Sequence, residues 1–124
     1  MGGGIVKMNQ FLTAMQTSVK PIVAVVRGVS MGIGFTQLTC YDFIFASSDA
    51  WFMTPFMSSM QSPEGLSTLM FPKLFGTKLA NEILMMDKRI TAKQAEQVGF
   101  VNKVVPELQG EPDFFDLDKV PAIG

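Results

Sequence analysis

The spacing of apolar and polar residues predicts helices that alternate with short strands. Apolar side chains recur every three or four residues over residues 7–17, the pattern of one helical face, and Pro21 follows soon after. The β-branched run over residues 22–26 is continuous, which is typical of a strand buried on both faces. Two more short strands are predicted over residues 43–46 and 51–53. This alternation favours an α/β fold.

Proline and threonine positions predict where three further helices begin and end. A short helix is expected over residues 35–38, and another over residues 66–71 that stops before Pro72. Thr77 is placed to cap a helix that runs to Met86, with its apolar face turned inward. The segment over residues 58–65 is rich in Ser, Gln and Pro, and it is expected to be a loop.

Towards the end of the chain, the sequence predicts a capped helix followed by a strand. Thr91 and Gln94 have the spacing of a capping box, in which each side chain satisfies the other residue's backbone N–H. Gly99 is expected to end this helix in the left-handed conformation, and a strand over residues 101–105 follows.

The length and composition fit a single domain and exclude several classes of function. We expect residues 1–108 to form one partial domain and residues 109–124 to form a poorly ordered tail. The net charge of −1 gives no basic surplus for nucleic acid, and no apolar run reaches the ~20 residues of a membrane span. With no His and one Cys, a His/Cys zinc site, a Ser-His-Asp triad and a disulfide framework are excluded. Any catalytic base must be a carboxylate, a Lys or a Tyr.

A glycine-rich turn after the first predicted strand supports three interpretations. Gly28, Gly32 and Gly34 resemble the phosphate loop of short-chain dehydrogenases. That family also needs a Tyr-x-x-x-Lys pair, but the only tyrosine, Tyr41, has Phe45 at the lysine position. The same turn can expose backbone N–H groups that stabilise an enolate oxygen, forming an oxyanion hole. It can also be a tight turn that packs a helix on a strand.

The second candidate for chemistry is Glu64, in the segment Gln61-Ser-Pro-Glu-Gly65. Ser62 suits a helix N-cap and Pro63 the first helical position, so Glu64 can be an ordinary acid of a first helical turn. Apolar residues precede and follow it, so the carboxylate can instead lie against an apolar wall. Such surroundings make a carboxylate a better general base.

Several of these segments together resemble the crotonase (enoyl-CoA hydratase/isomerase) superfamily, over about residues 20–107. The resemblance rests on Lys20-Pro-Ile-Val-Ala-Val-Val26, Met31-Gly-Ile-Gly34, Asp42-Phe-Ile-Phe-Ala46, Trp51-Phe-x-Thr-Pro-Phe56 and Gln61-Ser-Pro-Glu-Gly65. It implies a partial crotonase-like (ClpP/crotonase) spiral of strands with surrounding helices. Family members are longer, so it also implies an incomplete member whose activity alone is open.

Within the superfamily, the last two motifs are similar to the peroxisomal Δ3,Δ2-enoyl-CoA isomerase branch. The resemblance implies that Glu64 is the single catalytic acid/base and that Ile33 supplies a backbone N–H to the oxyanion hole. It places Thr36 and Phe56 where hydratases of the family carry two glutamates, which disfavours hydration. The residues expected to bind substrate are Gly32, Phe56, Met57 and Met60.

The same resemblance implies the ligand, the assembly and the compartment. The substrate is expected to be an unsaturated fatty acyl-CoA from β-oxidation, with no metal, nicotinamide or flavin. A homo-oligomer, trimeric or hexameric, is expected in the peroxisome or the mitochondrion. A non-enzymatic alternative stays open, because chromodomain Y-like proteins carry a similar crotonase-like domain that binds acyl-CoA or acts as a scaffold. Glu64 discriminates between the two, since those domains can carry Asp there.

Overall fold

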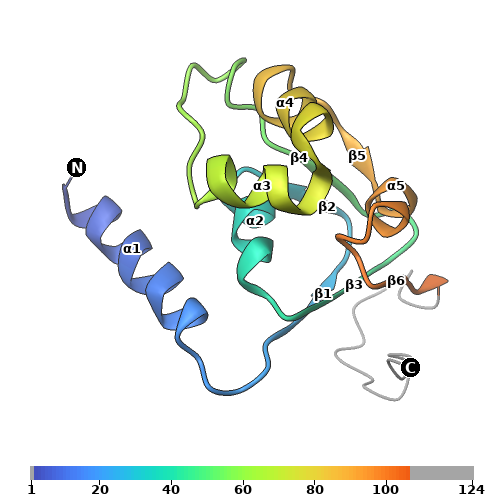
Figure 1. Ribbon diagram of the computed structural model, residues 1–124, viewed down its shortest axis with the longest axis horizontal. Coiled ribbons are helices and arrows are strands. Elements are labelled where there is room, and N and C mark those ends of the chain that lie inside the picture. Colours follow the sequence, from blue (N-terminus) through green and yellow to red (C-terminus); the bar gives the residue numbers. More distant parts are fainter. Residues whose placement is uncertain (1, 107–124) are drawn as a thin grey trace.

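The computed structural model describes residues 2–106, which form two small sheets with helices packed against them (Figure 1). The domain end predicted at residue 108 and the tail predicted from residue 109 lie outside the described residues. In chain order the elements are α1 (Gly2–Gln16), β1 (Val23–Val26), β2 (Val29–Met31), α2 (Ile33–Thr36), the 3₁₀ helix η1 (Gln37–Cys40), β3 (Phe43–Ala46), β4 (Trp51–Met53), α3 (Ser67–Phe75), α4 (Thr77–Met85), β5 (Ile90–Thr91), α5 (Ala92–Gln97) and β6 (Lys103–Val104).

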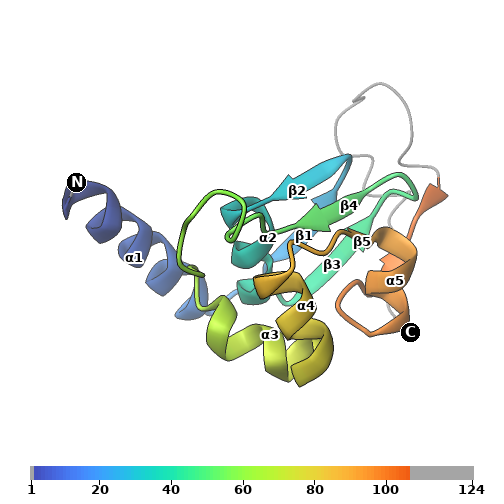
Figure 2. The ribbon, with the colours of Figure 1, turned by 90° about the horizontal axis from the view of Figure 1, so that it is seen from above.

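The two sheets are short and mostly parallel. One has the order β1-β3-β6 with all strands parallel, and the other has the order β2-β4-β5, in which only β5 is antiparallel. Figure 2 shows α3 and α4 on the same side of the strands. The predicted α/β fold is therefore confirmed, and the strands at residues 43–46 and 51–53 have the predicted bounds.

A cluster of aromatic rings forms the centre of the core and joins four parts of the chain. Phe35 of α2 is fully buried, and its ring centroid lies 5.2 Å from that of Phe52 and 4.8 Å from that of Phe71. The ring of Phe35 also lies 6.0 Å from Phe75 and 5.5 Å from Phe100. Tilted and edge-on pairs of rings at such distances stabilise the fold by more than the burial of their apolar surface alone. Phe35 thus fixes α2 against β4, α3 and the segment after α5.

The first strand differs from the prediction. It was expected to be buried on both faces, yet Val23 is 45% exposed and Val25 is only half-buried, while Ala24 and Val26 are buried. The reason is its position, since β1 is the edge strand of its sheet and the residues described cover only one of its faces. The pattern of burial therefore alternates, as in a half-covered strand.

Two helix boundaries also differ from the prediction. Helix α3 continues through Pro72 to Phe75, although the proline removes the bond to the carbonyl of Thr68. Phe71 and Phe75, on either side of it, are buried in the core and hold the helix in place. Thr77 does not cap α4; Gly76 precedes the helix, and no side-chain cap bond is formed there. The short helix predicted over residues 35–38 is displaced to α2 and η1, and the predicted final strand shortens to β6.

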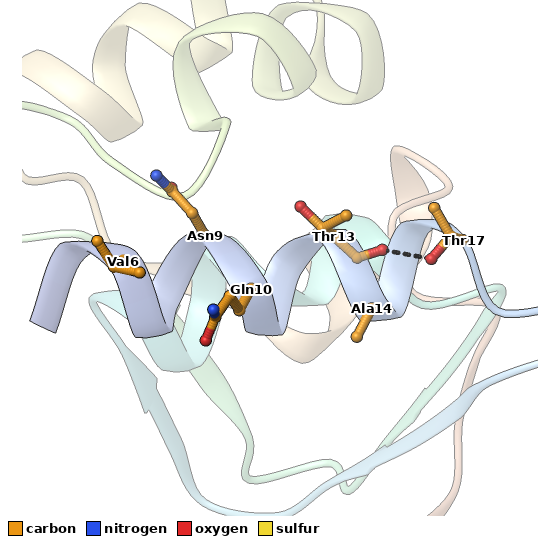
Figure 3. Close-up of a pocket in the computed structure, with 6 residues that line it drawn as sticks. All are labelled: Val6, Asn9, Gln10, Thr13, Ala14 and Thr17. Carbon is orange, nitrogen blue, oxygen red and sulfur yellow. Dashed lines mark hydrogen bonds between the residues drawn. The ribbon is translucent and has the colours of Figure 1, made fainter. Parts of the chain in front are cut away.

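Helix α1 lies at one end of the molecule, apart from the two sheets (Figure 1). It begins at Gly2 rather than at the predicted residue 7, and Leu12 is its buried contact with the rest of the fold. Figure 3 shows a surface depression lined by residues of this helix and by Thr17 directly after it: Val6, Asn9, Gln10, Thr13, Ala14 and Thr17. No residue predicted to act in catalysis or substrate binding lies there. None of the helices within residues 2–106 is long and apolar enough to cross a membrane.

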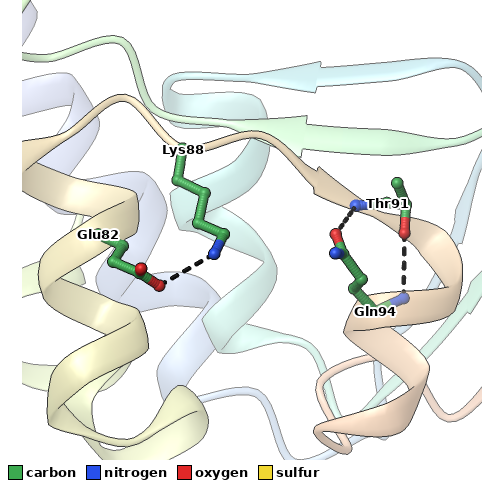
Figure 4. Close-up of polar contacts among 4 residues, drawn as sticks. All are labelled: Glu82, Lys88, Thr91 and Gln94. Carbon is green, nitrogen blue, oxygen red and sulfur yellow. Dashed lines mark hydrogen bonds and ion pairs between the residues drawn. The ribbon is translucent and has the colours of Figure 1, made fainter.

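The predicted capping box is confirmed. Thr91 Oγ1 accepts the backbone N–H of Gln94 at 3.1 Å, and Gln94 Oε1 accepts the backbone N–H of Thr91 at 3.0 Å (Figure 4). At the other end of α5, Gly99 has φ 85° and its N–H donates to the carbonyl of Glu96, while Phe100 N–H donates to that of Ala95. These two bonds are a Schellman motif, so the predicted left-handed glycine is confirmed as well.

We expect Thr91→Ala to lower the free energy of unfolding by about 1 kcal/mol, because the backbone N–H of Gln94 loses its acceptor. Thr77→Ala is the matched control: Thr77 is also an exposed threonine at a helix start, but its side chain makes no cap bond. Its effect should stay within about 0.5 kcal/mol. Urea denaturation followed by circular dichroism measures both, and equal losses would contradict the assignment.

Candidate functional site

The turn between β2 and α2 is tied to the neighbouring strand through Gly32. This residue has φ 60° and ψ −125°, a conformation that favours glycine. Its N–H donates to the carbonyl of Met53 in β4 at 2.9 Å. Its carbonyl accepts the N–H groups of Phe35 at 2.9 Å and Thr36 at 3.0 Å. The turn is therefore held from both sides by backbone hydrogen bonds.

The start of α2 leaves two backbone donors unused. Ile33 and Gly34 are its first two residues, and their N–H groups donate to no protein acceptor within residues 2–106. Ile33 is 37% exposed, so its surroundings are open to a ligand. A turn that only packs a helix on a strand needs no such unused donors, whereas a phosphate loop or an oxyanion hole would use them. The geometry is compatible with the predicted oxyanion-hole role of Ile33.

Glu64 lies in a loop, not in the first turn of a helix as one interpretation predicted. The loop joins β4 to α3, whose N-cap is Leu66 in the left-handed conformation. Gly65 and Leu66 both have φ 65°, so the chain turns twice before a helix can begin, and Ser62 caps nothing. Glu64 is half-buried, and its carbonyl accepts the N–H of Ser67 at 3.1 Å.

Gly65 brings the two candidate segments together. A Cβ atom at Gly65 would lie 3.0 Å from Thr36 Cβ and 3.2 Å from Ile33 Cδ1, and closer still to Thr36 Oγ1. Real Cβ atoms almost never approach other atoms so closely, so only glycine fits against α2 at this point. The contact brings the segment that carries Glu64, one residue earlier, against the side chains of Ile33 and Thr36 in α2.

The loop before Glu64 is held by a carboxylate that sequence reasoning missed. Asp87 accepts the backbone N–H of Met57 at 3.2 Å and that of Ser58 at 2.9 Å. Asp87 has φ 51°, and it lies two residues after the end of α4 at Met85. Thr54, at the loop's start, donates through its buried hydroxyl to the carbonyl of Ile83 in α4 at 3.0 Å. No sequence pattern pointed to these contacts, because they join residues about thirty positions apart.

The predicted substrate-binding residues separate into two groups. Phe56 is 1% exposed and belongs to the hydrophobic core, so its side chain offers a ligand almost no surface. Met57 and Met60 are 45% and 92% exposed and lie on the same loop. Gly32 forms the turn described above. The structure therefore presents Met57 and Met60 at the surface between the core and Glu64.

Other chemistry is absent from the part of the chain that the structure describes. No group of three His, Cys, Asp or Glu side chains there could hold a metal ion. Cys40 is half-buried, with the Thr39 hydroxyl 3.9 Å from its Sγ. The Gly32–Ile33 turn and Glu64 remain the only pair of predicted functional segments that the fold of residues 2–106 brings together.

Comparisons with known proteins agree with this architecture. The sequence model described as "Enoyl-CoA hydratase/isomerase" matches residues 6–113. The chain is 43% identical over 100 residues to enoyl-CoA delta isomerase 3, peroxisomal, of Mus musculus. The matched segment covers 81% of this chain and 32% of the mouse protein. It is 42% identical over 85 residues to the human chromodomain Y-like protein, covering 68% of the chain and 14% of that protein.

Among solved structures, an enoyl-CoA hydratase/isomerase from Pseudoalteromonas atlantica T6c superposes with a TM-score of 0.77 at 30% identity. The match covers 90% of this chain and 43% of that one. The predicted crotonase-like fold and family resemblance are thereby confirmed, and the chain corresponds to part of that fold. It spans about a third of the mouse isomerase.

We expect Gly65→Ala to lower the free energy of unfolding by about 3 kcal/mol, because its Cβ combines an unfavourable φ with a clash against Thr36. Gly99→Ala is the control, since Gly99 has φ 85° but nothing within 4 Å of an added Cβ. It should lose only about 1 kcal/mol. Thermal unfolding of both variants separates the cost of the unfavourable φ from the cost of the clash with Thr36. Equal losses of stability would show that Gly65 does not approach α2 closely in solution.

Proposed function

Because the chain belongs to the enoyl-CoA hydratase/isomerase family, we propose that it carries the acid/base centre of a 3-enoyl-CoA isomerase. The observation that supports this most is the close approach of Gly65, the residue after Glu64, to the side chains of Ile33 and Thr36 in α2. A carboxylate and a backbone donor side by side are the two groups that moving a double bond next to a thioester requires.

The reaction needs one base that acts twice. Glu64 takes a proton from C2 of the 3-enoyl thioester, and the electrons of that C–H bond pass into a dienolate. The negative charge gathers on the thioester oxygen, where the N–H of Ile33 donates to it. The protonated Glu64 then returns the proton to C4, which leaves the double bond between C2 and C3. No atom is gained or lost, so neither a metal nor a redox cofactor is required.

Among residues 2–106, we expect no second base beside Glu64 for the alternative reaction, the hydration of a 2-enoyl thioester. Thr36 and Phe56 stand where the resemblance places the two glutamates of a hydratase, and neither can act as a base. The carboxylate of Asp87 is tied to two backbone N–H groups of the loop. Glu64 therefore works alone among the described acids that this loop approaches.

The proposed substrate is an unsaturated fatty acyl-CoA from β-oxidation. Met57 and Met60, exposed on the loop before Glu64, are the apolar side chains best placed to contact its acyl chain, with Phe56 beneath them in the core. The name of the mouse relative supports a peroxisomal location, and we keep the mitochondrion as the alternative. Val23, Val29 and Met31 expose apolar surface on the edge strands, which supports a homo-oligomer, trimeric or hexameric.

The second candidate is a non-catalytic acyl-CoA-binding or scaffolding module, supported by the similarity to the chromodomain Y-like protein. Both functions use the same fold, so binding of acyl-CoA does not distinguish them. Isomerisation of 3-enoyl-CoA does distinguish them, because a module that only binds acyl-CoA does not catalyse this reaction. The assay below therefore measures isomerisation and binding separately.

We expect Glu64→Gln to reduce isomerisation of 3-enoyl-CoA by about 10⁴-fold or more while binding of acyl-CoA persists, because one carboxylate serves both proton transfers. Since the chain spans a third of its mouse relative, the assay also uses a chimera in which residues 6–113 replace the matched segment of that protein. The chain alone should show little or no turnover.

Glu82→Gln in the same chimera is the matched control. Glu82 forms an ion pair with Lys88 at 3.0 Å on the partly exposed side of α4, so its loss should change the rate by less than about threefold (Figure 4). A Glu64→Gln variant that keeps more than about a tenth of the rate would refute the single-base mechanism. A chimera that binds acyl-CoA without isomerising it would favour the scaffold.

A further inference from the structure

Two buried hydroxyl groups in the described part of the chain have no hydrogen-bond partner, and both belong to residues around Glu64. They are Thr36 Oγ1 and Ser67 Oγ, on side chains that are 0% exposed. A buried polar atom without a partner destabilises a fold, and native proteins keep few of them. Their position on either side of one short segment therefore needs a physical reason.

The contacts show that this segment is Glu64–Gly65. The hydrogen that Gly65 carries in place of a side chain points at the Thr36 hydroxyl, which is the nearest atom to a Cβ built there. On the other side, the backbone N–H of Ser67 donates to the carbonyl of Glu64. The segment Glu64–Gly65 is thus in contact with Thr36, whose hydroxyl has no partner, and is bonded to the backbone of Ser67.

The local fold leaves the Thr36 hydroxyl without its usual partner. A helical threonine commonly donates to the carbonyl four residues earlier, which here is Gly32. That carbonyl already accepts the N–H groups of Phe35 and Thr36, and a carbonyl oxygen has two lone pairs. The hydroxyl of Thr36 is therefore a spare donor, held by α2 and aimed at the segment that carries Glu64.

We propose that Thr36 is a positioning residue whose hydroxyl donates a hydrogen bond to the Glu64 carboxylate when substrate is bound. This inference rests on the proposed function. Gly65 keeps the two elements in contact, and three rotatable bonds allow the Glu64 side chain to turn inward over it. In that position the carboxylate is held for proton transfer, and the spare donor of the resting fold becomes satisfied.

Stability of the full 124-residue chain tests whether the hydroxyl is unpaired at rest. Thr36→Ser and Thr36→Ala both lose the methyl group and differ only in the hydroxyl. We expect the Ala variant to melt about 4 °C above the Ser variant, because an unpartnered buried group is removed. At Thr54, equally buried but bonded to the Ile83 carbonyl, the order should reverse, with Ala about 4 °C below Ser.

Kinetics of the same pair in the chimera test the role of the hydroxyl. Thr36→Ala should lower kcat about tenfold relative to Thr36→Ser, with KM changed by less than about twofold, while the Ser variant stays within about threefold of the parent chimera. A merely structural hydroxyl would lower melting temperature and activity together. Here the more stable variant should be the slower enzyme, and the conservative variant should restore the rate.

Two results would overturn this inference. One is a lower melting temperature for Thr36→Ala than for Thr36→Ser, since the hydroxyl would then have a partner at rest. The other is equal kcat for the two variants in a chimera that needs Glu64. If instead Glu64→Gln leaves the rate unchanged, the proposed function fails first and this inference fails with it.

Discussion

The close approach of Gly65 to helix α2 is the constraint on which the site depends. Only a residue without a Cβ, and with a positive φ, fits against Thr36 and Ile33 at this point. Without that contact, Glu64 would be one acidic residue in a surface loop, and the free N–H of Ile33 would be one unused donor at a helix start. With it, the segment that carries Glu64 and the start of α2, about thirty residues apart in the chain, are in contact.

The aromatic core explains why the two segments can be held so closely. Phe35 lies in the same turn of α2 as Thr36, and its ring contacts that of Phe71 in α3. The packing that builds the core therefore also fixes the distance between α2 and the loop that leads into α3. Catalytic geometry of this kind depends on rigid packing behind the site, and Asp87 adds to it by holding the loop's backbone.

The sequence predicted the elements whose signals are local. The strands over residues 43–46 and 51–53 and the capping box of Thr91 follow from neighbouring residues, and all are present in the structure. Local rules failed where distant contacts decide: α3 continues through Pro72, and Glu64 lies outside the helix that Ser62 was expected to cap. Only the family resemblance predicted that Glu64 and Ile33 act in one site. A sequence pattern does not reveal contacts between two turns that are far apart in the chain. For the same reason, the sequence did not predict that the hydroxyl groups of Thr36 and Ser67 are buried without a partner.

The most direct test of the central claim is a nuclear Overhauser spectrum of the chain in solution. The account predicts cross-peaks from the α protons of Gly65 to the side chain of Thr36 and to the δ methyl group of Ile33, because both lie within contact distance. Those signals should persist in Glu64→Gln, which leaves the backbone contact intact. Absence of both cross-peaks in a folded chain would mean that Gly65 does not close on α2, and that Glu64 and Ile33 do not share a site.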